Sequence, residues 1–506
     1  PKNADRIPLI VNYPVSPKNP RAADWDDQGF PLRRNNEFYQ LSLRGDVDLS
    51  DSITLTSITA WNRMDIDQRN DLDGTAITAG RNHVRGVVSS LSQELRLSGS
   101  MGPLQWVLGA NYARDKANES TFLENLYTTA TYTIPTGPFL TNDLFSDQKF
   151  VSKAVFANVD YELTDRLTAH AGIRYTDADL DYRSCSKVGD PVTAASLTAF
   201  YNILRAGQNL PALSPIAAGQ CISLNSALTP ELRVGELDET STSWRLGLDF
   251  KPAPRTLIYA NVSRGYKGGS NPVIGALSAA QLTPVTQESV TAYEIGFKVP
   301  VAGRAVELSG AAFYYDYRDK QLKGRVRTTP DVFGALEGLV NVPKSWVKGA
   351  EFQANVYPVS GLTLMLGGTY LKTKVTSDFT NYTITGQIAN FQGDAFPYTP
   401  KWQLVADAAY EWRVSDEYKA FVGANANYRT KTRSGFGQEA VLNIDSYTLV
   451  DGRLGVRSDN GWEASLFVRN IFNEYYWTNV ARFLDTTRRF TGMPRTFGVQ
   501  LGYKFN

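Results

Sequence analysis

The chain has 506 residues, of which 42% are hydrophobic, 12% aromatic and 20% charged. This composition excludes a disordered chain, and the near-equal numbers of Lys plus Arg (52) and Asp plus Glu (51) remove the electrostatic argument for a nucleic-acid partner. No stretch approaches the roughly 18 consecutive apolar residues of a membrane-spanning helix, which excludes a helical membrane protein. A membrane β-barrel stays compatible with the low mean hydropathy, because its signal is alternation.

The opening segment, residues 1–36, is polar and rich in proline, with no apolar run like that of a secretory signal. We expect any export signal to lie upstream of Pro1. Residues 1–36 are interpreted as the remnant of an extracellular loop, and residues 37–506 as a partial transmembrane barrel.

Strict alternation of apolar and polar residues then runs through the chain, as in 167–175 and 418–428. Each such segment is expected to be a strand with one apolar and one polar face. Most have ten residues or more, which suits a tilted membrane strand of roughly 9–11 residues better than a soluble strand of roughly 5–6. We count 17 segments: 37–49, 52–65, 86–98, 104–115, 149–163, 166–180, 238–251, 254–264, 288–299, 304–318, 343–357, 361–375, 401–413, 417–430, 445–457, 461–470 and 494–505.

The connections between these segments alternate between short and long. Short turns near 51, 99–103 and 164–165 begin a series that continues to 458–460. The long connections are 66–85, 116–148, 181–237, 265–287, 319–342, 376–400, 431–444 and 471–493. Short periplasmic turns opposite long extracellular loops are typical of outer-membrane barrels. The sequence therefore predicts an all-β, transmembrane, antiparallel β-barrel.

Several segments resemble one family. They are "IYANVSRGYKGGSNP" at 258–272, "AYEIGFK" at 292–298, "NIFNEYY" at 470–476, "PRTFGVQLGYKF" at 494–505, and "SLSQELRLSG" with "LQWVLGANY" between 90 and 112. Together they are similar to the barrel of TonB-dependent outer-membrane receptors.

The resemblance implies a barrel of about 22 strands with a plugged lumen. About five strands and the whole plug are then expected upstream of Pro1. It also implies a monomer in the outer membrane of a Gram-negative bacterium, in contact with lipid and lipopolysaccharide. Energy would come from the TonB–ExbB–ExbD complex through the N-terminal part.

Motifs of enzymes are absent: there is no G-x-S-x-G, no P-loop, no H-E-x-x-H and no dinucleotide fingerprint. His83 falls in a predicted loop and His170 on a polar strand face, too far apart in sequence to indicate a metal pair. We expect no catalytic activity and no covalently bound cofactor, with iron present only as part of a transported chelate. An outer-membrane hydrolase is a weak alternative.

The only two cysteines, Cys185 and Cys221, fall in the longest predicted loop, 181–237. An extracellular loop lies in an oxidising environment, which favours a disulfide over two free thiols. In the chain-entropy model such a bond stabilises the loop by roughly 4 kcal/mol.

The last long connection is rich in aromatic and arginine residues. Guanidinium groups beside aromatic rings suit an anionic, partly aromatic ligand, because Arg offers paired donors while rings supply stacking area. Lipopolysaccharide binding or simple solvation of the rim would use the same residues. Candidate ligand-binding residues are Arg264, Tyr266, Lys267, Tyr475, Tyr476, Trp477, Arg482, Arg488 and Arg489, with further positive charge from Lys320, Lys323, Arg325 and Arg327.

Two functions follow from this pattern. The first is an energy-coupled importer, for which a ferric siderophore is the preferred cargo on family frequency and on the arginine and aromatic content of the loops. The second is a passive, porin-like solute channel. Long loops and the resemblance favour the importer.

Overall fold

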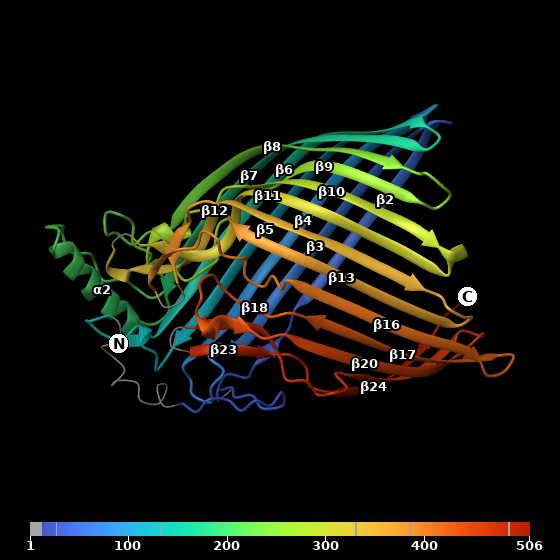
Figure 1. Cartoon of the computed structure of the whole chain (residues 1–506). Helices are drawn as coiled ribbons and strands as arrows, with labels where there is room; N and C mark the ends of the chain where they lie inside the picture. Colours follow the sequence, from blue (N-terminus) through green and yellow to red (C-terminus); the bar gives the residue numbers. More distant parts are fainter. Residues whose placement is uncertain are drawn as a thin grey trace.

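The computed structural model describes residues 13–505 apart from 27, 133, 329–330, 384–385 and 484–485. One curved antiparallel sheet dominates the molecule (Figure 1). It contains 18 strands, one of which is the two-residue β1. The 17 longer strands correspond one to one with the 17 predicted segments, so the predicted fold class is confirmed.

The strands of the main sheet follow each other in chain order. Their bounds are β1 (Arg33–Arg34), β2 (Glu37–Ser50), β3 (Ile53–Asp71), β4 (Gly80–Met101), β5 (Leu104–Asn125), β6 (Thr141–Thr164), β7 (Leu167–Val188), β8 (Arg233–Phe250), β9 (Leu257–Lys267), β10 (Glu288–Val301), β11 (Val306–Arg327), β12 (Ala335–Val356), β13 (Leu362–Val375), β16 (Trp402–Arg413), β17 (Tyr418–Arg429), β20 (Tyr447–Ser458), β21 (Trp462–Arg469) and β24 (Thr496–Tyr503).

Each long strand pairs with its neighbours in sequence, as in an up-and-down barrel wall. Among the described residues, β2 pairs only with β3 at one edge of this wall and β24 pairs only with β21 at the other. The short two-residue β1 lies beside the outer end of β3.

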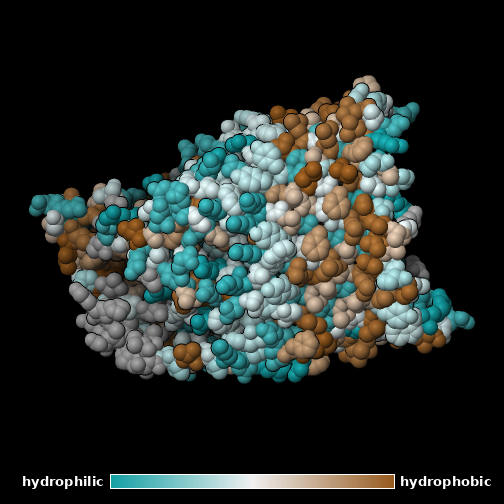
Figure 2. Space-filling view, in the orientation of Figure 1, coloured by the Kyte–Doolittle hydropathy of each residue, from teal (hydrophilic) through white to brown (hydrophobic). Residues whose placement is uncertain are grey.

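The apolar faces of the strands form a band next to the short turns, shown in brown in Figure 2. Its height can be followed on β16, where the exposed rings of Trp402 and Trp412 stand ten positions apart on one face. Ten residues of a strand tilted by roughly 40° rise roughly 25 Å, the height of the apolar belt of outer-membrane barrels. On β17, Tyr418 and Tyr428 repeat the same spacing.

The opposite face of the wall is polar and carries ion pairs. Arg453 on β20 reaches Asp407 on β16 with both terminal nitrogens, at 2.9 and 3.0 Å. Arg457 on the same strand binds Glu411 at 2.9 Å. Charged side chains facing lipid would cost up to a few kcal/mol each, so this face lines the lumen.

Thiol labelling tests this assignment of faces on β7. Ala169 lies directly opposite Tyr161 and Leu248 on the apolar face, while Thr168 points the other way. We expect a membrane-impermeant maleimide to label Thr168→Cys and to spare Ala169→Cys in intact outer membranes, read by gel shift. Equal labelling of the two variants would mean that the faces are exchanged or that the wall is not in lipid.

Long strands and loops extend beyond the band on the side opposite the short turns. Their described residues include one α-helix, α2 (Pro191–Ala206), and the short helices η2 (Ala130–Tyr132), η3 (Ala279–Leu282), η5 (Asp331–Phe333) and η6 (Ala440–Leu442); η4 (Ala302–Arg304) lies in a short turn. They also contain three small hairpins: β14 (Thr380–Tyr382) with β15 (Ile388–Asn390), β18 (Thr432–Arg433) with β19 (Asn443–Ile444), and β22 (Trp477–Phe483) with β23 (Thr486–Thr491). None of the helices among these residues is long and apolar enough to cross a membrane.

Candidate functional site

The loops at the outer end of the strands pack on one another through two hydrophobic clusters. The first cluster joins α2 to the β5–β6, β7–β8 and β9–β10 connections and includes Leu197, Phe200, Tyr201, Ile222 and Leu224. The second joins β11–β13 to the 376–400 connection and includes Val342, Val375, Phe379, Phe391 and Phe396. These connections are therefore folded structure at the outer end of the strands.

Helix α2 lies inside the connection expected to be a plain loop. Asp190 caps it, accepting hydrogen bonds from the Thr193 backbone N–H at 2.8 Å and from the Thr193 hydroxyl at 2.6 Å. Pro191 occupies the first helical turn, where no N–H is needed. Tyr201 is fully buried and donates to the Ile222 carbonyl at 2.7 Å, and burial raises the pKa of this phenol.

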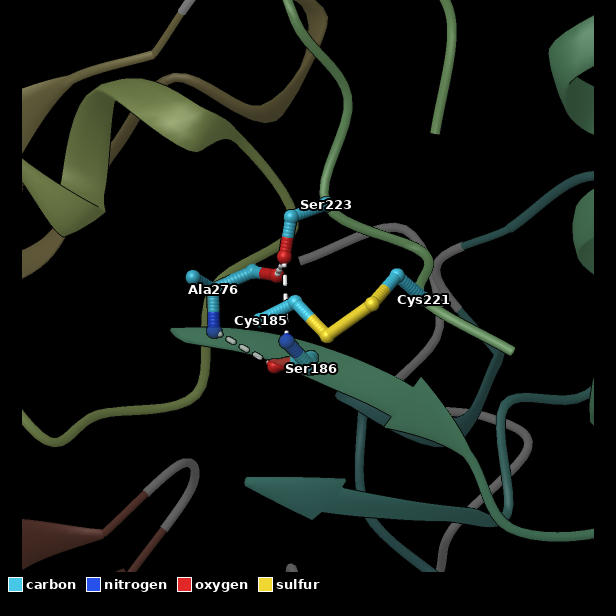
Figure 3. Close-up of a disulfide and its surroundings, with 5 residues drawn as sticks. All are labelled: Cys185, Ser186, Cys221, Ser223 and Ala276. Carbon is cyan, nitrogen blue, oxygen red and sulfur yellow. Dashed lines mark hydrogen bonds between the residues drawn. A yellow bond between two sulfur atoms is a disulfide. The ribbon is translucent and has the colours of Figure 1, made fainter. Parts of the chain in front are cut away.

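Cys185 and Cys221, 36 positions apart in sequence, are bonded to each other in the structure (Figure 3). The boundaries of the expected loop need correction, because β7 extends to Val188 and places Cys185 on a strand. Beside the bond, Ser223 donates to the Ala276 carbonyl at 2.7 Å, and the Ala276 N–H donates to the Ser186 hydroxyl at 2.8 Å. The bond thus lies where β7 and the two loops meet.

The last long connection forms the β22–β23 hairpin, which contacts β19 and η6 of the β17–β20 connection. Its aromatic residues pack against cations: the Arg489 guanidinium lies 4.4 Å from the centre of the Trp477 ring. Tyr475 meets the same Trp477 ring edge-on, and Tyr476 packs on Tyr447 with ring centres 4.4 Å apart.

The three arginines of this hairpin lie on two faces. Arg489 is paired with Val480, and Arg482 with Thr487, so these two arginines share one face. Arg488 lies on the other face, where burial lowers the pKa of its guanidinium against the opposing effect of Asp71, Asp73 and Glu337. The charges of three carboxylates thus act on Arg488, and only Arg482 and Arg489 share a face as expected for a common ligand.

Strand alternation also separates the candidates at the end of β9. Arg264 is paired with Trp244 and Thr291, and Tyr266 with Ser289, which places both on the same face as the exposed Tyr293. Arg264 donates to the Tyr266 hydroxyl at 2.8 Å on this outward face. Only Lys267 is on the lumen side, and the three residues do not form one site.

Lys267 instead belongs to a lumen-side group with Lys320. The Lys320 ammonium lies 4.3 Å from the centre of the Tyr317 ring, 5.4 Å from that of Phe396 and 3.8 Å from the Glu288 carboxylate. Burial lowers the pKa of Lys320, partly offset by Glu288 and reinforced by the positive charge of Lys267. Sequence reasoning named Lys320 only as a rim charge, and nothing in its surroundings in sequence identified Phe396 as a partner.

The other rim cations of β11 are already paired. Lys323 binds Glu337 at 2.9 Å, and Arg327 forms an exposed ion pair with Asp331 at 2.5 Å. Burial lowers the pKa of Arg325, with Glu337 opposing and Arg482 adding to the effect. The positive charge of Arg482, on the β22–β23 hairpin, therefore acts on Arg325, on the wall strand β11.

Comparison with known proteins identifies the chain. A family model described as "TonB dependent receptor-like, beta-barrel" matches residues 3–471. The chain belongs to this family. The family and the fold are those of transport receptors, which places this receptor barrel in the outer membrane of a Gram-negative bacterium.

Curated relatives match the chain at low identity. The receptor barrel is 21% identical to the pesticin receptor of Yersinia pestis over 74% of this chain and 46% of the relative. It is 27% identical to the ferric-pyoverdine M114 receptor PbuA of Pseudomonas sp. (strain M114) over 39% of this chain and 24% of the relative. The chain thus spans about half or less of the length of these relatives.

Solved structures agree on the fold. The ferric yersiniabactin uptake receptor FyuA from Yersinia pestis superposes with a TM-score of 0.70 at 17% identity, over 94% of this chain and 62% of that one. The siderophore receptor PiuA from Acinetobacter baumannii gives a TM-score of 0.68 at 16% identity, over 96% and 66%.

The two histidines of the receptor barrel lie on wall strands and contact carboxylates of neighbouring strands. His170 lies on the lumen face of β7 between Asp160, 2.6 Å from Nδ1, and Asp249, 3.4 Å from Nε2. His83 lies on β4, not in a loop, and its Nε2 is 2.7 Å from Asp67. The described residues contain no group of three His, Cys, Asp or Glu side chains placed to hold a metal ion.

The connection between β3 and β4 carries a buried carboxyl. Asp73 accepts hydrogen bonds from the N–H groups of Thr75 (2.9 Å) and Gly80 (2.7 Å). The upstream segment packs on the same connection, since Asp26 accepts from Thr78 and the Tyr13 hydroxyl accepts from the Ala76 N–H at 2.8 Å. Burial raises the pKa of Asp73, aided by Asp71 and opposed by those hydrogen bonds.

A raised carboxyl pKa in the folded state makes this connection more stable at low pH. Between the ordinary carboxyl range and the raised value, the folded loop binds more protons than the open loop, so its stability falls as pH rises. After correction for intrinsic rates, the Gly80 amide should exchange more slowly at pH 4.5 than at pH 7. Asp73→Asn should remove this difference between the two pH values. Equal protection of the Gly80 amide at pH 4.5 and pH 7 in the wild type would contradict the raised pKa of Asp73.

Proposed function

We propose that the protein captures a ferric siderophore complex at its loop-covered mouth and imports it across the outer membrane with TonB-supplied energy. The printed names of relatives support the cargo: they include a ferric-pyoverdine receptor, a ferric yersiniabactin uptake receptor and a siderophore receptor. A copper transporter also shares the fold, so the fold alone leaves the cargo open.

The observation that carries the proposal is the pairing of cations with aromatic rings around the mouth. Arg489 with Trp477 and Lys320 with Tyr317 each present a positive charge beside an aromatic ring. An anionic chelate with aromatic iron-binding groups could meet charge and stacking area at once. Folded loops keep these groups in place and reduce the entropy lost on binding.

Energy coupling is the second part of the proposal. TonB, ExbB and ExbD are the proposed partners, acting through the N-terminal part of the protein, and a monomer is the proposed functional unit. We propose no catalytic step and no resident cofactor; iron enters and leaves as cargo.

A passive solute channel is the second candidate. A cavity of about 950 Å³ lies on the wall beside Glu411, Arg453 and Arg457, whose charged groups would suit contact with water and small solutes. A channel requires no high-affinity ligand and no energy.

Two measurements on the purified protein separate these candidates. The ferric complexes of a tris-catecholate, a tris-hydroxamate and a carboxylate siderophore are titrated against its tryptophan fluorescence. The receptor proposal expects one class to bind with a Kd of roughly 1 µM or tighter, and planar bilayers to show no steady conductance. Steady conductance with no saturable binding of any complex would establish the channel instead.

A further inference from the structure

Three aromatic side chains follow one another along the lumen face of β11. Phe313, Tyr315 and Tyr317 occupy alternate positions of this strand, which lies between β10 and β12 in the wall (Figure 1). Tyr314 and its register partner Tyr293 are exposed on the opposite, outward face. Phe313, Tyr315 and Tyr317, the β11 aromatic track, therefore face the lumen.

Small residues beside the track give its rings room. Phe313 is paired with Gly349 of β12, where a Cβ atom would lie 2.9 Å from the Phe313 ring. Tyr315 is paired with Ala292 of β10. Phe313 stacks on Tyr315 with ring centres 4.9 Å apart, and all three residues of the track stay half-buried. The stacked contact fixes the Tyr315 ring while part of the track remains accessible from the lumen.

Elsewhere on the lumen wall, a guanidinium group lies over an aromatic ring. The Arg457 guanidinium carbon is 5.3 Å from the centre of the Phe421 ring, for example. Among the residues that the structure describes, no such cation is found over Phe313 or Tyr315. Lipid does not explain these two rings either, because interfacial aromatic residues belong on the outward face. The track thus offers stacking area that the described part of the wall does not use.

The two ends of the track differ in charge. At the outer end the Lys320 ammonium lies 4.3 Å from the centre of the Tyr317 ring, and the charges of Lys320 and Lys267 exceed that of Glu288. At the inner end Glu294 is directly opposite the first ring of the track. An anionic ligand is therefore expected to place its charge at the outer end and its rings along the track, above the inner carboxylate.

We propose that Tyr315 and Tyr317 stack on the aryl groups of the cargo and select chelates whose iron-binding groups are aromatic. This inference rests on the proposed function and adds a subsite on the lumen wall to the cation–ring pairs of the mouth. Contacts between aromatic rings are favourable beyond the area that they bury, and a hydroxamate or carboxylate chelate has no aromatic iron-binding group to offer. Phe313 is a positioning residue, acting through its stacked contact with Tyr315.

The test is calorimetric titration of the purified protein in detergent with a ferric tris-catecholate and with a ferric tris-hydroxamate that has no aryl group. The wild type should bind the catecholate complex at least about tenfold more tightly than the hydroxamate complex. Tyr315→Leu with Tyr317→Leu keeps apolar bulk but removes both rings, so the catecholate complex should bind about tenfold more weakly. Any binding of the hydroxamate complex should stay the same within about twofold.

Two comparison variants separate stacking from a structural role. Tyr315→Phe with Tyr317→Phe keeps both rings and should bind the catecholate complex as the wild type does. Tyr293→Leu with Tyr314→Leu removes two rings from the outward face of β10 and β11 and should leave both affinities unchanged.

Selectivity between the complexes distinguishes this inference from the proposed function. Tighter binding of the hydroxamate complex by the wild type, or equal losses for both complexes in the lumen-facing leucine variant, would overturn the aromatic subsite and leave a siderophore receptor. The same loss from the outward-facing leucine variant would also overturn it. Binding of neither complex would overturn the subsite, and if a ferric carboxylate siderophore also failed to bind, the proposed function would be rejected with it.

Discussion

Replacing Cys185 and Cys221 together with alanine is expected to destabilise the loop between β7 and β8 by about 4 kcal/mol, the chain-entropy value for a closed loop of this length. The wall strands should hold, because their pairing does not depend on the bond. Amides of α2 should then exchange on the order of a thousandfold faster, measured by hydrogen exchange with mass spectrometry.

Wild-type protein treated with a reductant provides the matched control, since it should reproduce the exchange pattern of the alanine variant. Exchange in β16 and β17, far from the bond, should stay the same in all samples. Unchanged protection of α2 in both the variant and the reduced protein would mean that the first hydrophobic cluster alone holds the loop.

Arg482→Ala with Arg489→Ala is expected to weaken binding of the ferric siderophore that the protein prefers by at least about a hundredfold, since each hydrogen bond from a charged group to an anion contributes roughly 1.5–3 kcal/mol. The two residues share one hairpin face, so they can reach the same ligand. Fluorescence titration at two ionic strengths should also show a smaller salt dependence for the variant.

The control for this prediction is Lys323→Ala with Arg327→Ala. It removes the same charge from the rim, but both cations are exposed and already neutralised by Glu337 and Asp331. We expect less than about a threefold effect, since exposed ion pairs contribute little. Equal losses in the two variants would indicate that the rim acts only through its overall charge.

Alternation was sufficient to predict the membrane-spanning part of the fold. Residues such as 418–428 have lipid on one side and water on the other, and their sequence alternates between apolar and polar residues accordingly. Above the band the contrast ends, because water or packed loops lie on both sides. The upper parts of β5 (116–125) and β12 (335–342) therefore carried no signal and were expected to be loops.

Helix α2 had a local signal that was not used. Asp190 followed by Pro191 and Thr193 is the pattern of an N-cap with proline in the first turn, and apolar residues at 194, 197, 201 and 204 follow with helical spacing. Its packing partner Ile222 lies beyond the helix in the same connection, and that contact could not be read from local sequence.

The candidate site was predicted by residue type but only partly by geometry. Counting alternate positions from Ile258 along β9 would have placed Arg264 and Tyr266 on the outward face. No local pattern could have shown that the charges of Asp71, Asp73 and Glu337 act on Arg488, or that Phe396 meets Lys320, because these residues are far apart in the sequence.

Uptake of radioactive iron by whole cells tests the central proposal most directly. Cells that depend on this protein are given the preferred ⁵⁵Fe-siderophore complex with and without an uncoupler that collapses the proton gradient, and again in a strain without TonB. The importer account predicts saturable uptake that falls to the level of surface binding in both treated cases. Uptake that continues without the gradient or TonB and rises linearly with concentration would contradict it and would identify a passive channel.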